Sequence, residues 1–173
     1  NAFAMVKNPH FQPIFSRIAI GNPLLATEAD YEKVVDALQE DIEQYASKDG
    51  DALILVGHGT DHPANSCYSQ LQNILQKHYG PKVFVGTIEG YPDLEDILFQ
   101  LKSIGAQQVT LKAFMLVAGD HAQNDIAGDE ADSWKTTLKK AGYEVQAILT
   151  GLGENDKFVQ IWIDHIRDIL SQK

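Results

Sequence analysis

Two histidines and a glutamate in this sequence each come after an apolar run, and together they could bind a divalent metal ion. These residues are His58, Glu89 and His121. Imidazole nitrogens and carboxylate oxygens are frequent ligands of divalent transition metals. A neutral imidazole also accepts protons near neutral pH, so the two histidines are candidates for acid–base chemistry as well.

The spacing of these residues indicates how they would meet. About thirty residues separate His58 from Glu89 and Glu89 from His121, which is the length of one βαβ unit. The carboxyl ends of parallel strands lie at one edge of a sheet, where ligands bind in open α/β folds. For His58 alone, between Gly57 and Gly59, a histidine in a glycine-rich turn is the plain alternative. The repetition of the pattern favours one shared metal site.

The other histidines and the one cysteine have simpler interpretations. His78 falls in the last turn of an expected helix, where the helix dipole favours a cation, and His165 borders the apolar stripe of another helix. We expect both to be structural. We expect Cys67 to be a small residue near a helix start, and a single cysteine excludes an internal disulfide and a cysteine-based zinc site.

The composition excludes several classes of protein. The chain has 173 residues, 44% of them hydrophobic, and 24 acidic against 14 basic residues, which gives a formal net charge of −10. Lys and Arg are scattered, which argues against a nucleic-acid surface. No run approaches the roughly 20 apolar residues that cross a bilayer, and no G-x-x-x-x-G-K-[ST] motif is present. We expect no nucleic-acid partner, no membrane, no nucleotide and a cytoplasmic location, with the periplasm left open.

Apolar runs of strand length alternate with helical patterns along most of the chain. The expected strands cover 53–56, 83–88, 108–117 and 144–150. Continuous apolar strands are typical of a parallel sheet with both faces covered. The pattern predicts an α/β fold, a three-layer sandwich with a parallel sheet, over residues 27–173. The apolar end of the third strand, 114–117, is either ordinary core or a wall suited to a flat aromatic ligand.

Local signals place the starts of the expected helices. Thr27 and Asp30 form a weak capping-box pattern, Asn65 or Ser66 is an expected cap, and Pro92 stands near the first position of a third helix. The last two helices should turn inward the residues Ile126, Ala131, Trp134, Leu138, Phe158, Ile161, Trp162, Ile166, Ile169 and Leu170.

The first 26 residues differ from the rest in their pattern. Residues 1–16 contain two prolines and three phenylalanines without a regular period, and 17–21 could form a short strand. We expect 1–26 to be an irregular segment with a short strand that joins a partner domain or subunit. Because Asn1 is not an initiator residue, we expect the chain to be trimmed, processed or part of something longer.

Three separated motifs resemble those of a known family. They are Val-Gly-His-Gly-Thr at 56–60, Glu-Gly-Tyr-Pro at 89–92, and the run 119–129 that leads into Ser-Trp-Lys at 133–135. In order and spacing they resemble the anaerobic (class II) sirohydrochlorin cobaltochelatases of the CbiK family. The likeness covers essentially the whole chain but only the second half of a typical member. Family members have two similar chelatase-like domains, of the flavodoxin or Rossmann kind, with the tetrapyrrole between them.

The resemblance implies an enzyme that inserts Co²⁺ into sirohydrochlorin without ATP or another nucleotide, in the anaerobic cobalamin pathway. It implies that His58, Glu89 and His121 bind the metal and that the two histidines are catalytic. The ring contacts that it suggests are Gly57, Thr60, Tyr91, Met115 and Leu116. A missing N-terminal domain or a second copy of the chain is the partner expected to complete the cleft.

Other interpretations use the same residues. Affinity order alone favours nickel over cobalt at such a site, so a ferrochelatase or nickelochelatase acting on a related tetrapyrrole is the nearest alternative. A module that binds haem or another tetrapyrrole without catalysis is a second, and a metal-assisted hydrolase with Asp120 or Asp125 as base is less favoured. The acidity of the chain opposes a polycarboxylate ring, and helix N-termini near Asn65 and Asn124 could offset this.

Overall fold

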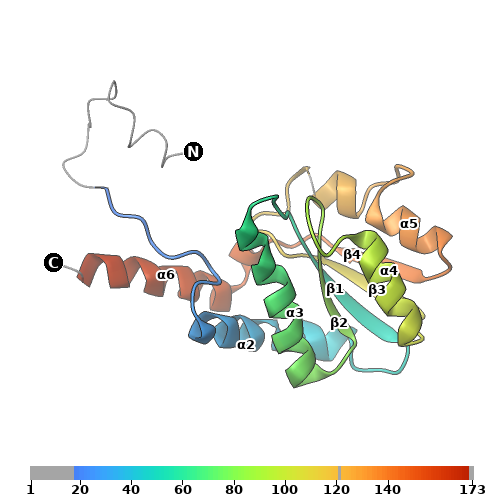
Figure 1. Cartoon of the computed structure of the whole chain (residues 1–173), viewed down its shortest axis with the longest axis horizontal. Helices are drawn as coiled ribbons and strands as arrows, with labels where there is room; N and C mark the ends of the chain where they lie inside the picture. Colours follow the sequence, from blue (N-terminus) through green and yellow to red (C-terminus); the bar gives the residue numbers. More distant parts are fainter. Residues whose placement is uncertain (1–17, 121, 172–173) are drawn as a thin grey trace.

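The computed structural model describes residues 18–120 and 122–171, which form a parallel four-stranded sheet with helices on both faces (Figure 1). In chain order, the strands are β1 (Asp51–Gly57), β2 (Val83–Thr87), β3 (Gln108–Ala113) and β4 (Glu144–Ile148). Their order across the sheet is β2-β1-β3-β4, and each neighbouring pair is parallel. The predicted three-layer α/β architecture is confirmed.

Helices of very different lengths connect and follow these strands. They are α2 (Glu28–Tyr45), η1 (Pro63–Asn65), α3 (Ser66–Tyr79), α4 (Leu94–Ser103), η2 (Ala122–Ile126), α5 (Trp134–Lys140), η3 (Leu152–Glu154) and α6 (Asp156–Ser171). Within the described ranges, none of them combines the length and the apolar character that crossing a membrane requires.

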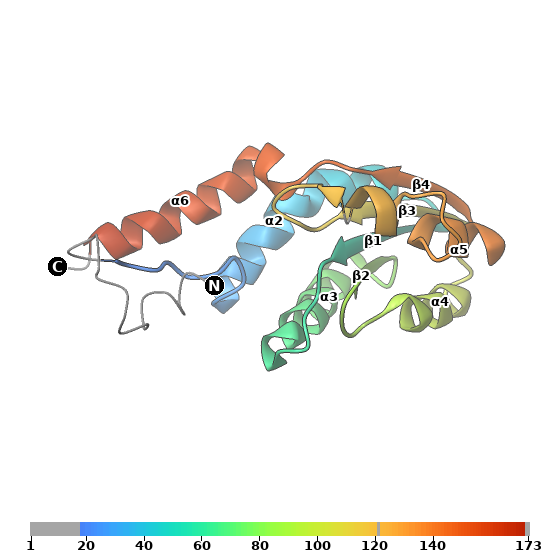
Figure 2. The same ribbon diagram turned by 90° about the horizontal axis from the view of Figure 1, so that it is seen from above.

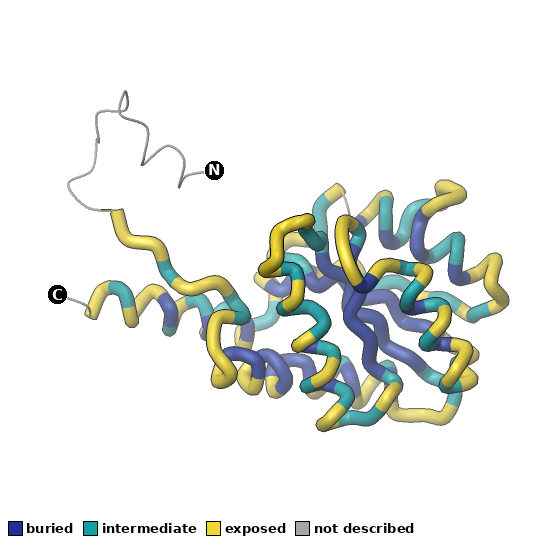
Figure 3. The backbone as a smooth tube through the Cα atoms, in the orientation of Figure 1, coloured by how far each residue is buried: buried dark blue, intermediate teal, exposed yellow. Residues whose placement is uncertain are grey.

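The two faces of the sheet are covered by different helices. Because side chains alternate along a strand, Leu53 and Leu55 of β1 pack in one core with α2, α3 and α6, whereas Ile54 and Val56 pack in a second core with α4 and α5. All four side chains are fully buried, and β1, β2 and β3 form the most buried part of the sheet (Figure 3). Burial on both faces explains why the strand is apolar without alternation.

The helix starts follow the predicted signals with one shift. Thr27 caps α2, and its capping box with Asp30 is formed in both directions. At the start of α4, the carboxylate of Asp93 accepts a hydrogen bond from the backbone N–H of Asp96 at 3.0 Å. Asp93 is therefore the cap, and Pro92 lies just before it rather than at the first helical position.

The cap expected for α3 is not formed by a side chain. Asn65 occupies the capping position, but its side chain makes no hydrogen bond to the first turn of α3. Ser66 is instead the first residue of the helix. The Asn65 side-chain amide is instead hydrogen-bonded to the loop after β1 and to the loop after β2.

The third strand is shorter than predicted. β3 ends at Ala113, and the sheet's last bond on this side is donated by the backbone N–H of Phe114 to the carbonyl of Val56. The chain then leaves the sheet, and the carbonyls of Met115 and Leu116 accept bonds from the segment around η3. The apolar run thus continues beyond the strand because it forms a surface outside the sheet. β4 likewise ends at Ile148, before the predicted Thr150.

The single helix predicted after His121 is divided in two. Ala122–Ile126 forms a short π-helix, and a second helix, α5, begins after Ser133. The Ser133 hydroxyl donates to the carbonyl of Gly128 and accepts from the backbone N–H of Thr136, so Ser133 both ends the connecting turn and caps α5. Ala131, which was expected to face inward, lies in that turn and is exposed.

The segment before α2 is not a strand where it is described. Ile18 to Gly21 is irregular, and Ile18 and Ile20 are exposed. The segment runs beside α6, where a Cβ at Gly21 would lie 2.9 Å from the side chain of Ile169. It packs on a helix instead of pairing with an edge strand, which explains the difference from the predicted strand. Residues 1–17 lie outside the described residues, so the expected contact of 1–26 with a partner stays a prediction.

The last helix extends beyond the sheet (Figure 2). Its first half buries Phe158 and Ile161, as predicted. Ile166 and Leu170 were predicted to face inward, but their exposed fractions are 55% and 77%. The apolar stripe therefore continues past the part of the helix that the sheet can cover.

The two histidines expected to be structural make ordered contacts. His165 is buried, with Nε2 3.0 Å from Asp30 Oδ1 and Nδ1 3.1 Å from the carbonyl oxygen of Asn22. His78 at the end of α3 pairs with Glu32 of α2 at 3.2 Å. Each histidine thus connects two segments of the fold.

Candidate functional site

The candidate metal ligands lie at the carboxyl edge of the sheet. β1 lies between β2 and β3, so the loop that carries His58 is flanked by the loops after both neighbouring strands. His58 directly follows β1, and Glu89 comes two residues after β2. This is the arrangement that the spacing of the motifs predicted for these two residues.

The structure brings His58 and Glu89 together. His58 Nδ1 lies 3.8 Å from Glu89 Oε2, and the backbone N–H of Glu89 donates to the carbonyl of His58 at 2.7 Å. Two ligands of one tetrahedral metal ion with bonds of 2.0–2.2 Å are about 3.4 Å apart, so the 3.8 Å separation is close to that of a shared ion. About half of each side chain is exposed, which leaves the pair accessible to an incoming ion.

The third predicted ligand, His121, lies outside the described residues. Without it, the described part of the chain contains no cluster of three or more His, Cys, Asp or Glu side chains arranged for a metal. The complete three-residue site therefore stays a prediction. Its expected position follows from β3, whose carboxyl end adjoins that of β1.

The glycines around His58 are required by close contacts. Gly59 has a φ of +83°, and a Cβ there would collide with the carbonyl group of Glu89. A Cβ at Gly57 would collide with the ring of Tyr68. Glycine at both positions thus lets the loop after β1 lie directly against the loop after β2 and against α3.

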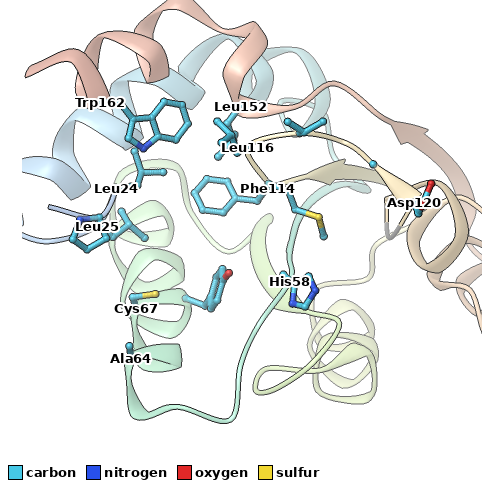
Figure 4. Close-up of a pocket in the computed structure, with 15 residues that line it drawn as sticks. Leu24, Leu25, His58, Ala64, Cys67, Phe114, Leu116, Asp120, Leu152 and Trp162 are labelled. Atoms are coloured by element: carbon cyan, nitrogen blue, oxygen red, sulfur yellow. The ribbon is translucent and has the colours of Figure 1, made fainter. Parts of the chain in front are cut away.

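An apolar cavity of about 600 Å³ opens beside His58 (Figure 4). Its lining comes from the segment before α2, the start of α3, the loop after β3, η3 and α6, and includes Leu24, Leu25, Cys67, Tyr68, Phe114, Met115, Leu116, Val117, Leu152 and Trp162. Leu116 and Val117 are 58% and 71% exposed. Exposed aliphatic side chains around a cavity are a surface suited to a large apolar ligand.

Two of the five predicted ring contacts line this cavity, and the other three lie elsewhere. Met115 and Leu116 line this cavity. Tyr91, which is 64% exposed, instead lines a polar groove between α3 and α4. Gly57 is covered by Tyr68, and the backbone N–H of Thr60 is bonded to Asn65.

Several lining residues were not found by sequence reasoning. Leu24 and Leu25 precede α2, in a segment that no periodic pattern connects to the site. Trp162 was predicted to face inward without a role in binding, and no sequence signal gives Tyr68 of α3 such a role. These residues meet only because α6, α3 and the segment before α2 converge near the end of β3 (Figure 4), and a pairing of that kind has no local sequence signal.

Burial keeps two titratable lining groups neutral. Burial raises the pKa of the Cys67 thiol above its usual value, although backbone hydrogen bonds oppose this. Burial also raises the pKa of Tyr68, whose hydroxyl lies 3.5 Å from the backbone nitrogen of Gly59. Cys67 is therefore a thiol rather than a metal-binding thiolate at neutral pH. Among the described residues, His58 and Glu89 are therefore the candidate metal ligands that lie together.

Comparison with known proteins gives one family and related chains. A family model described as cobalt chelatase (CbiK) matches residues 3–171. The chain is 34% identical over 160 residues to a sirohydrochlorin cobaltochelatase of Salmonella typhimurium, covering 92% of this chain and 60% of that protein. It is 36% identical over 157 residues to the sirohydrochlorin cobaltochelatase CbiKC of Nitratidesulfovibrio vulgaris, covering 91% and 55%. The chain thus spans less than two thirds of the length of these relatives.

Proposed function

The chain belongs to the CbiK family of cobalt chelatases, and on this basis we propose that it inserts Co²⁺ into the tetrapyrrole sirohydrochlorin. The observation that carries the proposal is the position of His58. This residue pairs with Glu89 at 3.8 Å and also lines the apolar cavity. A metal ligand at the boundary between a polar pair and an apolar cavity can meet both the ion and a flat ring. The two relatives are named for this reaction.

The proposed reaction exchanges one Co²⁺ for two protons. The ion, which is a substrate, loses water as it binds His58, Glu89 and His121. The two pyrrole N–H bonds of the ring then break, their electron pairs bind the metal in place of the imidazoles, and the two protons pass to the released imidazole nitrogens or to water. Glu89 supplies a hard oxygen ligand and compensates the charge of the ion. No nucleotide takes part in these steps.

The apolar cavity is the proposed seat of the ring. Met115 and Leu116 would contact one face of the ring, and removing their apolar surface from water is favourable. Gly57, Thr60 and Tyr91 are not among the residues that line this cavity. They stay proposed contacts because the loops that carry them adjoin His58 and Glu89. A second α/β domain or a second copy of the chain would cover the exposed side chains of Leu116 and Val117. We place the reaction in the cytoplasm, in anaerobic cobalamin synthesis.

An absorption assay with the full 173-residue chain tests this proposal. Free sirohydrochlorin is mixed with Co²⁺, with and without protein, and the spectrum of the cobalt-bound ring is followed without nucleotide. We expect a rate proportional to protein concentration, and a higher rate with Co²⁺ than with Ni²⁺ or Fe²⁺. A faster reaction with Ni²⁺ or Fe²⁺ would favour the nickelochelatase or ferrochelatase alternative. Ring binding without any metal-dependent change would instead identify a non-catalytic tetrapyrrole-binding module.

A further inference from the structure

Asn65 joins the two loops that carry the candidate metal ligands. Its Oδ1 accepts a hydrogen bond from the backbone N–H of Thr60 at 3.0 Å, and its Nδ2 donates to the carbonyl of Tyr91 at 2.6 Å. Thr60 lies two residues after His58, and Tyr91 lies two residues after Glu89. One side chain therefore bridges the loop after β1 and the loop after β2.

This bridge supplements backbone bonds between the same loops. The backbone N–H groups of Ile88 and Glu89 donate to the carbonyls of Gly57 and His58 at 3.0 and 2.7 Å, close to the strand ends. Asn65 adds a second attachment on the far side of the two ligands. Its amide also packs on Gly90, where a Cβ would lie 3.0 Å from Asn65 Oδ1 and the φ is 142°. Attachment on both sides of His58 and Glu89 restricts how far their side chains can separate.

The chemistry of the amide explains the choice of asparagine. The backbone N–H of Thr60 can only donate and the carbonyl of Tyr91 can only accept, so the bridging group must offer one acceptor and one donor. Aspartate would place a carboxylate oxygen against the Tyr91 carbonyl, and an aliphatic residue would satisfy neither group. Asparagine is also a preferred helix cap, yet at the start of α3 it makes no capping bond. Its side chain is committed to the loops.

We propose that Asn65 is a positioning residue that sets the spacing of His58 and Glu89 for a divalent cation. This inference rests on the proposed function, because it assigns the pair to metal capture. Asn65 itself contacts neither the ion nor the ring. Losing the bridge should let the loop at 58–62 move away from Glu89, so that the ion is bound by fewer ligands at a time.

Cobalt binding to the full chain, without any ring, tests the inference. The dissociation constant for Co²⁺ is measured from its visible absorption, whose intensity also reports the coordination geometry. We expect Asn65→Ala to weaken Co²⁺ binding by about 10- to 100-fold, the usual effect of residues that orient metal ligands, and to change the band intensity. In the insertion assay the KM for Co²⁺ should rise, while kcat at saturating Co²⁺ and the Kd for the ring stay near wild type.

Asn73, an exposed residue on the same helix, provides the matched controls. Asn73→Ala should bind Co²⁺ like the wild type. Asn65→Asp keeps the shape and the acceptor for Thr60 but loses the donor to Tyr91, so it should bind Co²⁺ more weakly than Asn73→Asp, which adds the same charge. Asn65→Asp also serves as the test should Asn65→Ala fail to fold.

The outcomes separate this inference from the proposed function. If the wild type binds Co²⁺ and inserts it, and both Asn65 variants bind Co²⁺ as tightly as their Asn73 counterparts, the positioning role is wrong and the function stands. A raised Kd for the ring with an unchanged Kd for Co²⁺ would also overturn it. If the wild type neither inserts Co²⁺ nor binds it in a way that His58→Ala abolishes, the proposed function fails.

Discussion

The two glycines beside His58 let its loop pack closely against neighbouring parts of the fold. Gly59 adopts a backbone angle that favours glycine, and its missing Cβ makes room for the carbonyl of Glu89. Gly57 makes room for the ring of Tyr68. The sequence shows the two glycines, but it does not show which groups of the protein lie against them. Those groups depend on which loops meet, and loops meet through the whole fold.

A second pair of residues acts on stability rather than chemistry. Asp30 and His165 are buried and lie 3.0 Å apart, and the Asp30 carboxylate also accepts bonds from Thr27. Burial alone would raise the pKa of Asp30, but the hydrogen bonds from His165 and Thr27 outweigh it and lower the pKa below its usual value. The carbonyl of Asn22 occupies the other ring nitrogen of His165. His165 therefore joins α2 to the segment before that helix.

Asp30→Asn should therefore destabilise the protein in a pH-dependent way. A carboxyl whose folded pKa is lowered stabilises the fold fully above its unfolded pKa of about 3.9, and this contribution is lost as the pH falls through the folded value. We expect a loss of about 3 kcal/mol at pH 7, as for a broken buried pair, and a smaller loss below pH 4. Urea unfolding from pH 3 to 7 measures this.

Asp129→Asn is the matched control for that experiment. Asp129 pairs with Lys135 at 2.9 Å but is exposed, so its substitution should leave the free energy of unfolding nearly unchanged at every pH. A loss for Asp30→Asn that stays constant or grows below pH 4 would show that its ionised carboxylate does not stabilise the fold.

At the level of elements, the end of β3 separates what the sequence could predict from what it could not. Strands β1 and β2 and the cap at Thr27 follow from apolar runs and capping residues. The apolar run 114–117 looked equally like core or like a ligand wall, since hydrophobicity alone does not tell which surface a side chain meets. In the structure Phe114 is part of the core, whereas Leu116 and Val117 are exposed at the cavity. The same limit explains why Ile166 and Leu170 on α6 were predicted to face inward but are exposed.

Leu116 should contribute to ring binding without contributing to stability. Its side chain is 58% exposed at the cavity, so Leu116→Ser removes little buried area from the free protein. A bound ring would bury it, and losing about 1 kcal/mol of apolar contact weakens binding about fivefold. Fluorescence titration with free sirohydrochlorin measures the Kd. Leu170→Ser, the same change at a more exposed leucine on α6, should leave the Kd unchanged, and equal Kd values for the two variants would exclude the cavity as the ring site.

At the level of the whole molecule, the net charge opposes binding of the ring and favours binding of Co²⁺. The formal net charge of −10 repels a polycarboxylate ring and attracts Co²⁺. Salt screens both effects, since the Debye length falls to about 10 Å at 0.1 M. Raising the salt concentration from about 20 to 200 mM should tighten ring binding and weaken Co²⁺ binding, each by roughly two- to threefold. Weaker ring binding at high salt would indicate that a local positive site dominates.

The whole-molecule arrangement also marks the limit of sequence reasoning at the site. Strand spacing placed His58 and Glu89 together, because parallel strands in successive βα units end at the same edge. The cavity beside them could not be predicted, since Leu24 and Trp162 come from opposite ends of the chain. Asn65 was predicted as a cap from its type and position, and only the meeting of two loops shows its bridging role.

The central claim is that His58 serves both the metal and the ring chemistry, and His58→Ala tests it most directly. The initial rate of Co²⁺ insertion into sirohydrochlorin is compared with that of the wild type at saturating Co²⁺, and ring binding is measured in the same samples. We expect the rate to fall by about 100-fold or more, the size of a lost acid–base group, while the Kd for the ring changes by less than about threefold, because apolar contact carries most of its binding. Near-normal insertion by His58→Ala would contradict the role assigned to this residue.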